Sequence, residues 1–131
     1  MKRILLFIFF ACISTITFSQ SRINYSANEI KQEFQESQYN LKAGYDKNGN
    51  YYISIITGNS TVFYYFDPDK ICKATFIVPD NQGALNAYVE LYNTRYVIVS
   101  PTHWKMYNNN GVSEVNLIYP TGGGYYFMWS N

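Results

Sequence analysis

Alternating hydrophobic and polar positions fill most of the chain and predict eight β-strands. The runs are 39–45, 51–57, 61–66, 71–78, 96–100, 103–107, 113–119 and 125–130. Glycine, asparagine and proline separate them and favour tight turns between neighbouring antiparallel strands. The separators are Asn48-Gly49, which predicts a type I′ turn, and Gly58-Asn59, Asp67-Pro68-Asp69, Asn110-Gly111 and Gly122-Gly123-Gly124.

Counting by period two assigns one face of each strand to the core. The inward set predicted in this way is Tyr51-Ile53-Ile55, Ala74-Phe76-Val78, Trp104-Met106, Val115-Leu117-Tyr119 and Tyr125-Phe127-Trp129.

Two segments carry the signals of helices instead. Ser26 and Glu29 form a capping box, and the helix that they begin is expected to run to about Ser37. A second helix is expected after Asp80 or Asn81, with apolar residues at helical spacing up to about Thr94. The prediction is therefore an α+β fold: a single antiparallel sheet of about 6–8 strands, arranged as a meander, with two helices packed on one face. The repeated order of helix and strands is compatible with a duplication, although no residue-level repeat supports it.

The first residues have the order of a secretory signal. Lys2 and Arg3 precede an apolar run over 4–13, and a short polar stretch follows. This run is too short to span a bilayer core, which needs about 20 residues. Small residues place cleavage after Ser19, so that Gln20 begins the mature chain. We therefore expect a signal peptide over 1–19 and one α+β domain over 20–131, with no membrane span after signal removal.

The stretch that ends in Ser19-Gln20 resembles the signal peptides of small exported proteins of Bacteroidota. The helices and strands that follow resemble those of small uncharacterised exported proteins of this group. The resemblance implies export, to the periplasm or the extracellular medium, and implies no known activity. Cys12 follows a small residue, as in a lipoprotein signal, but Phe9 and Phe10 stand where leucine and a small residue are usual. A lipoprotein is therefore disfavoured.

Charge and cysteine content narrow the choice of partners. Without Lys2 and Arg3, the ten basic residues become eight against nine acidic ones, a net charge of −1. The basic residues form no cluster, which argues against binding to nucleic acid or an anionic membrane surface. Cys72 is the single cysteine of the mature chain, so an internal disulfide is impossible.

Two groups of residues with side-chain oxygen atoms are candidate metal ligands. Asp46, Asn48 and Asn50 copy the first three ligand positions of a calcium loop. The glycine and the closing glutamate of such a loop are replaced by Tyr51 and Thr57, so a hairpin turn is preferred. Asp67 and Asp69 could join Asp46 at a metal, but acidic residues beside a proline are ordinary in turns. The sequence therefore predicts no metal site and no cofactor.

His103 is the only histidine, which rules out a multi-histidine metal site within one chain. As a catalytic base it would need partners, and Glu114 or Ser113 could approach it across a hairpin. Cys72 could act as its nucleophile, but it lies in an apolar strand and suits a buried position. "TGGGYY" lacks the following helix of a phosphate-binding loop. We therefore expect no enzyme and no catalytic residues, and an enzyme that uses His103 ranks third among the functions considered.

The functional prediction depends on three pairs of adjacent tyrosines, Tyr51-Tyr52, Tyr64-Tyr65 and Tyr125-Tyr126. Because side chains alternate across a strand, one member of each pair must leave the core face. The predicted binding surface consists of Tyr52, Tyr65, Lys105, Tyr107 and Tyr126. Tyrosine also suits exposed strand positions without any ligand. A tyrosine-rich face with few charges is typical of recognition surfaces. We therefore expect an exported non-enzymatic binding module of the inhibitor, immunity or accessory type, with an unknown protein as its partner. The alternative is a carrier of a small molecule or glycan with an aromatic pocket.

Overall fold

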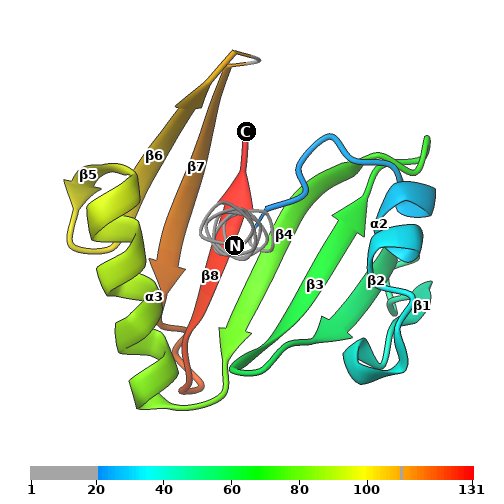
Figure 1. Ribbon diagram of the computed structural model, residues 1–131, viewed down its shortest axis with the longest axis horizontal. Helices are drawn as coiled ribbons and strands as arrows, with labels where there is room; N and C mark the ends of the chain where they lie inside the picture. The colour runs from blue at the N-terminus through cyan, green and yellow to red at the C-terminus, as the bar shows by residue number, and fades with distance from the viewer. Residues whose placement is uncertain (1–20, 110) are drawn as a thin grey trace, which may run out of the picture.

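The computed structural model describes residues 21–109 and 111–131. Its elements, labelled as in Figure 1, are α2 (Ala27–Glu33), the 3-10 helix η1 (Ser37–Tyr39), β1 (Lys42–Tyr45), β2 (Tyr51–Ile56), β3 (Ser60–Phe66), β4 (Cys72–Pro79), α3 (Gln82–Arg95), β5 (Val97–Ser100), β6 (His103–Asn108), β7 (Gly111–Ile118) and β8 (Tyr126–Ser130). All eight described strands belong to one antiparallel sheet. The predicted α+β fold is confirmed.

The strand order is β1-β2-β3-β4-β8-β7-β6-β5. The sheet is therefore two four-stranded meanders and not one continuous meander. The meanders meet through their last strands, because β4 pairs antiparallel with β8. Each meander follows a helix, α2 or α3, so the described part of the chain repeats one topology about an approximate twofold axis at the β4–β8 junction (Figure 1). This symmetry agrees with the duplication hypothesis at the level of topology.

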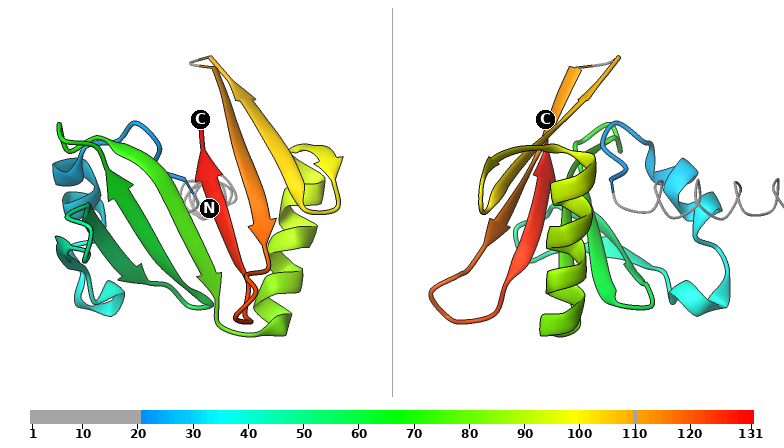
Figure 2. Two further views of the ribbon diagram at one scale, coloured as in Figure 1. Left: turned by 180° about the vertical axis from the view of Figure 1, so that it is seen from behind. Right: turned by 60° about the vertical axis from the view of Figure 1, so that its left-hand side comes forward.

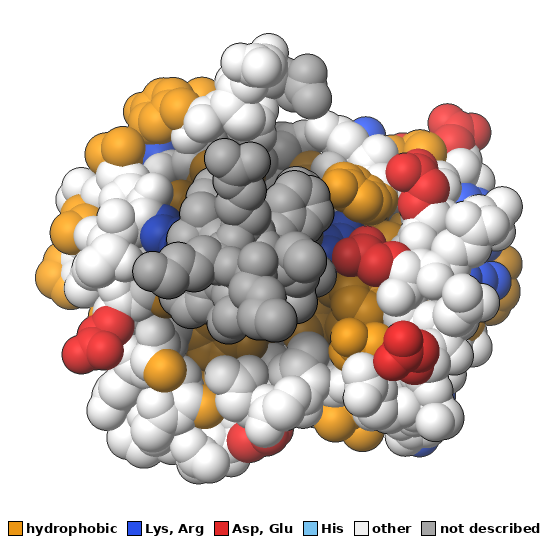
Figure 3. All heavy atoms as spheres, viewed as in Figure 1, with side chains coloured by type: hydrophobic (Ala, Val, Ile, Leu, Met, Phe, Trp, Pro, Cys, Tyr) orange, Lys and Arg blue, Asp and Glu red, His pale blue; other side chains and the backbone are white. Residues whose placement is uncertain are grey.

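Both helices lie on one face of the sheet, and the view from behind in Figure 2 presents strands that no helix covers. We call the covered side the helix face and the opposite side the open face. Figure 3 views the helix face, where acidic side chains gather on the α2 side.

Helix α2 begins with the predicted capping box. Ser26 Oγ accepts the N–H of Glu29, and the Glu29 carboxylate accepts the N–H of Ser26, both at 3.1 Å. The helix ends at Glu33, earlier than the expected end near Ser37. It ends there because Phe34 leaves helical geometry and packs into the core against Tyr39 and Tyr64.

A buried cation fixes α2 in a way that the sequence pattern did not predict. Arg22 is 2% exposed and its Nε donates to Glu33 Oε1 at 2.8 Å. Its guanidinium also lies over the rings of Tyr25 and Phe34. A buried arginine requires such pairing, because an unpaired buried charge is strongly destabilising.

Helix α3 starts from Asn81, whose side chain accepts the N–H of Ala84 at 2.8 Å, and the helix ends at Arg95, close to the expected end. Its inner side carries Tyr92, which is fully buried among Trp104, Phe127 and Trp129 at centroid distances of 5.1–5.6 Å. The N–H of Trp129 donates to the Tyr92 hydroxyl at 3.2 Å. This aromatic cluster forms the core under the second meander.

Period-two counting identified part of the core correctly. The residues that were predicted inward and are buried are Ile53, Ile55, Trp104, Val115, Leu117, Phe127 and Trp129. The prediction was wrong for the set Ala74-Phe76-Val78, which lies on the open face, and for Tyr119, which is 60% exposed beyond the end of β7.

A β-bulge at Lys73 explains the inverted face of β4. Cys72 points into the core, and the pairing of β4 with β3 slips by one residue immediately after it. Because the extra residue reverses the alternation, Thr75 and Ile77 become the buried positions and Phe76 turns to the open face.

The hairpin turn at Asn48-Gly49 forms where it was expected but has another geometry. Gly49 has φ +83°, whereas Asn48 is not among the residues with positive φ, so the turn is not type I′. The N–H of Gly49 donates to the carbonyl of Asp46 at 3.0 Å, and β1 and β2 are joined by a five-residue loop. The connection has five residues, and not the two of a type I′ hairpin, because the carbonyl of Asp46 accepts the hydrogen bond that closes the turn.

The signal peptide predicted over 1–19, the cleavage site between Ser19 and Gln20, and the lipidation candidate Cys12 lie outside the described residues. Within the described residues, no helix is both long enough and apolar enough to cross a membrane.

Candidate functional site

A row of aromatic side chains crosses four strands on the open face. Tyr52 on β2 packs against Phe63 and Tyr65 on β3, with ring centroids 6.4 and 5.8 Å apart. Tyr65 meets Phe76 on β4 edge to face at 5.4 Å, and Phe76 contacts Tyr126 on β8 at 5.8 Å. We call these five residues the aromatic row. All five are half-buried, so their rings support one another while one side stays in contact with solvent.

The aromatic row forms much of the floor of a hollow of about 640 Å³. The bulge in β4 is the reason that this floor is apolar, since it directs Phe76 and Val78 outward and not into the core. The hollow is lined by Asp46, Asn50, Phe63, Tyr65, Phe66, Asp67, Lys73, Ala74, Phe76, Val78 and Tyr126.

Two loops with the same hydrogen-bond pattern supply acidic residues to the hollow. In the β1–β2 loop, Asp46 Oδ1 accepts the N–H groups of Asn48 and Asn50, each at 2.9 Å. In the β3–β4 loop, Asp67 Oδ1 accepts the N–H groups of Asp69 and Ile71 at 2.9 and 3.0 Å. The fourth residue of each loop has positive φ, +83° at Gly49 and +63° at Lys70. Both carboxylates are therefore held in place by backbone groups.

These hydrogen bonds account for the metal-like spacing of the sequence. Asp46 and Asp67 accept N–H groups from their own loops, and Asp69 donates one of these N–H groups to Asp67. The described residues contain no group of three or more His, Cys, Asp or Glu that could hold a metal ion. The N–H of Asn50 lowers the pKa of Asp46, with burial acting in the opposite direction. Asp46 therefore carries its negative charge at neutral pH.

The electrostatic effect of Asp46 reaches the aromatic row. Burial raises the pKa of the Tyr65 hydroxyl, and the negative charge of Asp46 raises this pKa further. Lys73 is 52% exposed, and its Nζ lies 3.8 Å from Asp67 Oδ2. The charged side chains that line the hollow are thus two carboxylates, Asp46 and Asp67, and one lysine, Lys73.

The predicted binding residues divide between two regions of the open face. Tyr52, Tyr65 and Tyr126 belong to the aromatic row, as expected for one surface. Lys105 and Tyr107 lie on the same face, but on β6, beyond β8 and β7. On β7, Val112 lies opposite Tyr107 and Ile118 lies opposite Tyr126, so the two positions are six residues apart. At about 3.3 Å per residue, this is about 20 Å along the strand. Lys105 and Tyr107 are therefore not part of the hollow.

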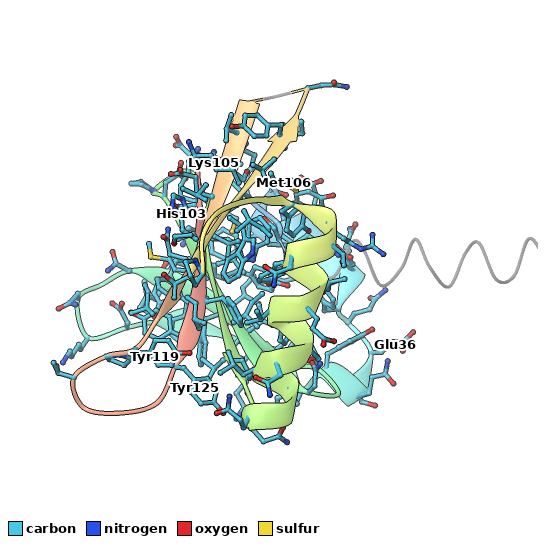
Figure 4. All side chains as sticks on the ribbon, turned by 90° about the vertical axis from the view of Figure 1, so that its left-hand side faces the viewer. Glu36, His103, Lys105, Met106, Tyr119 and Tyr125 are labelled. Carbon is cyan, nitrogen blue, oxygen red and sulfur yellow. The ribbon has the colours of Figure 1, made fainter. Side chains whose placement is uncertain are left out.

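His103 does meet one of its predicted partners. Its Nε2 lies 3.1 Å from Glu114 Oε1, and Lys105 Nζ lies 3.8 Å from the same oxygen. Figure 4 shows His103 and Lys105 on the side of the sheet opposite α3, whereas Met106 points toward the helix side. His103 thus has an orienting carboxylate on the open face.

The two nucleophile candidates lie on the other face. Cys72 is fully buried in the core, and burial raises the pKa of its thiol to about 11. Ser113 is also on the helix face, where its hydroxyl donates to Asn131 at 3.2 Å. Neither group shares a face with His103, so the arrangement does not form a nucleophile–histidine–carboxylate chain from these residues.

Of the residues that line the hollow, the sequence placed only Tyr65 and Tyr126 in the binding site. Phe76 and Val78 were assigned to the core, and no local signal in the sequence marks the bulge that redirects them. Asp46 and Asp67 were recognised as turn residues, but their shared position at the rim depends on the pairing of β2 with β3.

Comparison of the chain with protein-family models, with curated proteins and with solved structures finds no match. The fold and the site therefore define its class by themselves. It is an α+β domain whose single antiparallel sheet carries helices on one face and an aromatic hollow on the other.

Proposed function

We propose that the protein is an exported, non-enzymatic binding module that recognises another protein through the aromatic row of its open face. The observation that carries this proposal is the continuous contact of Tyr52, Tyr65, Phe76 and Tyr126 across four strands on the uncovered side of the sheet. Rigid aromatic side chains supply large contact area at a low cost in conformational entropy. Such residues dominate the binding energy of many interfaces.

Export to the periplasm or to the extracellular medium is part of the proposal and depends on the signal-like order of residues 1–19. The absence of a basic cluster in the sequence supports a protein as the partner in preference to nucleic acid.

A carrier of a small molecule or glycan is the second candidate. The hollow of about 640 Å³ is within the range of small-molecule sites, which are about 300–1,000 Å³, and its aromatic floor suits stacking on a ligand ring. A protein partner is favoured because the hollow lies on the outer surface of the sheet, where it would leave much of a small ligand in solvent.

The decisive experiment compares two double variants of the mature chain as baits in the native envelope or medium. The test variant is Tyr65→Ala with Tyr126→Ala, both in the aromatic row. The control is Tyr107→Ala with Tyr119→Ala, which removes two tyrosines that are 61% and 60% exposed and lie outside the hollow. Circular dichroism and urea unfolding confirm that both variants remain folded.

We expect the test variant to bind the captured partner more than about tenfold more weakly, because loss of a central aromatic residue typically costs about 2 kcal/mol or more. The control variant should bind like the unmodified chain. Equal affinity of the test variant and the unmodified chain would remove the aromatic row as the binding surface. A diffusible ligand seen by native mass spectrometry, without a protein partner, would favour the carrier function.

A further inference from the structure

The carboxylates at the rim of the hollow have unused hydrogen-bonding capacity. In both Asp46 and Asp67, the Oδ1 atom already accepts two backbone N–H groups. The Oδ2 atoms are engaged more weakly. Asp46 Oδ2 lies 3.4 Å from Asn50 Nδ2, and Asp67 Oδ2 lies 3.8 Å from Lys73 Nζ. Since an ionised carboxylate has about four acceptor sites, each Oδ2 can accept a further donor.

The charges around the hollow favour a cationic occupant. Two carboxylates face one lysine, and the pairing of Lys73 with Asp67 is loose and solvent-exposed, which makes it weak. An anionic occupant would meet two fixed negative charges above an apolar floor. A neutral occupant would cover these charges without compensating them. A cationic group compensates the negative charge of the two carboxylates and can donate hydrogen bonds to their free Oδ2 acceptor sites.

The floor of the hollow suits the same kind of group. Tyr65 and Phe76 meet edge to face at 5.4 Å and form a corner of two rings, with Tyr126 next to it. Aromatic faces attract ammonium and guanidinium groups. The aliphatic stem of a lysine or arginine can pack on apolar surface such as the rings of Tyr65 and Phe76 while its charged end reaches a carboxylate.

The chain itself already binds a cation with this arrangement at another place. Tyr45 and Tyr51 also meet edge to face, at 5.2 Å. The Nζ of Lys70 lies 3.6 Å from the Tyr51 centroid and 4.8 Å from the Tyr45 centroid, and it donates to the Tyr45 hydroxyl at 2.9 Å. Among the described residues, no lysine or arginine lies in this way over Tyr65 or Phe76.

We infer that the hollow receives a lysine or arginine side chain presented by the partner protein, with the stem on the rings of Tyr65 and Phe76 and the charged group between the carboxylates of Asp46 and Asp67. This inference rests on the proposed function and specifies the chemistry of the partner. The basic residue is expected to have apolar neighbours, because Tyr52 and Tyr126 place further aromatic rings beside Tyr65 and Phe76.

A display library of random peptides, selected on the mature chain, tests the inference. The test variant is Asp46→Asn with Asp67→Asn, which removes both charges but keeps an Oδ1 acceptor for the loop N–H groups. The control variant is Glu36→Gln with Glu90→Gln, which removes two exposed charges from the helix side (Glu36 in Figure 4). The strongest selected peptide is then measured against a matched peptide in which its basic residue is glutamine.

The inference expects selected peptides to share a lysine or arginine beside apolar residues. Replacement of this residue by glutamine, or use of the Asp46→Asn/Asp67→Asn variant, should weaken binding by about tenfold, while the control variant binds normally. Higher ionic strength should also weaken binding to the unmodified chain.

Two other outcomes overturn the inference in different ways. Peptides that require Tyr65 and Tyr126 but show no preference for a basic residue would reject the cationic occupant and leave the proposed function intact. A library from which the unmodified chain selects no more peptides than the Tyr65→Ala/Tyr126→Ala variant would reject the proposed function and this inference with it.

Discussion

Replacement of Tyr92 by phenylalanine tests how the core under the second meander is stabilised. The change removes one oxygen atom from a fully buried ring and keeps its packing against Trp104, Phe127 and Trp129. Trp129 Nε1 then loses the acceptor that lies 3.2 Å away, in a place without access to water. A buried donor left without a partner costs about 1–3 kcal/mol. This is a large fraction of the roughly 5–15 kcal/mol that stabilises a domain.

Urea unfolding followed by tryptophan fluorescence measures this loss. The midpoint should fall while the slope with urea concentration stays the same, because the surface exposed on unfolding does not change. Tyr119→Phe is the matched control. It removes the same atom from a side chain that is 60% exposed, so its effect should stay within about 0.5 kcal/mol.

A double variant separates the hydrogen bond from other effects of the substitution. In Tyr92→Phe combined with Trp129→Phe, neither polar group remains, so the combined loss of stability should be smaller than the sum of the two single losses. A loss below about 0.3 kcal/mol for Tyr92→Phe, or strict additivity in the double variant, would show that this hydrogen bond does not stabilise the core.

Two further predictions concern pH and processing. Burial raises the pKa of Tyr64, Tyr88, Tyr92 and Tyr96, and it raises the pKa of the Cys72 thiol from 9.0 to about 11. These groups ionise more readily in the unfolded chain, so stability should be fully present below about pH 9 and should fall as pH rises beyond it. Urea midpoints measured from about pH 7 to 11 check this, and a constant midpoint across that range would contradict it. For processing, the intact mass of the exported protein should correspond to a chain that begins at Gln20, and a lipid-modified chain that begins at Cys12 would contradict the prediction.

The sequence alone determined the features that depend on a few neighbouring residues. The capping box of Ser26 and Glu29, the start of the second helix at Asp80 or Asn81 and the positions of the hairpin turns are set by hydrogen bonds and φ preferences within about four residues. The same holds for the alternation that buries Phe127 and Trp129 and turns Tyr126 to the open face. These local preferences were sufficient to predict the α+β class and three of the five residues of the aromatic row.

Only the tertiary structure decided the features that join distant segments. The pairing of β4 with β8 brings Phe76 beside Tyr126, although the two are separated by a helix and three strands. The bulge at Lys73 places Phe76 on the open face, because one extra residue reverses a period-two pattern without leaving a mark in the sequence. Asp46 and Asp67 reach the same hollow because β2 and β3 are neighbours. A local pattern fixes how a segment folds, whereas the contacts that form the hollow depend on which strands pair and in which register.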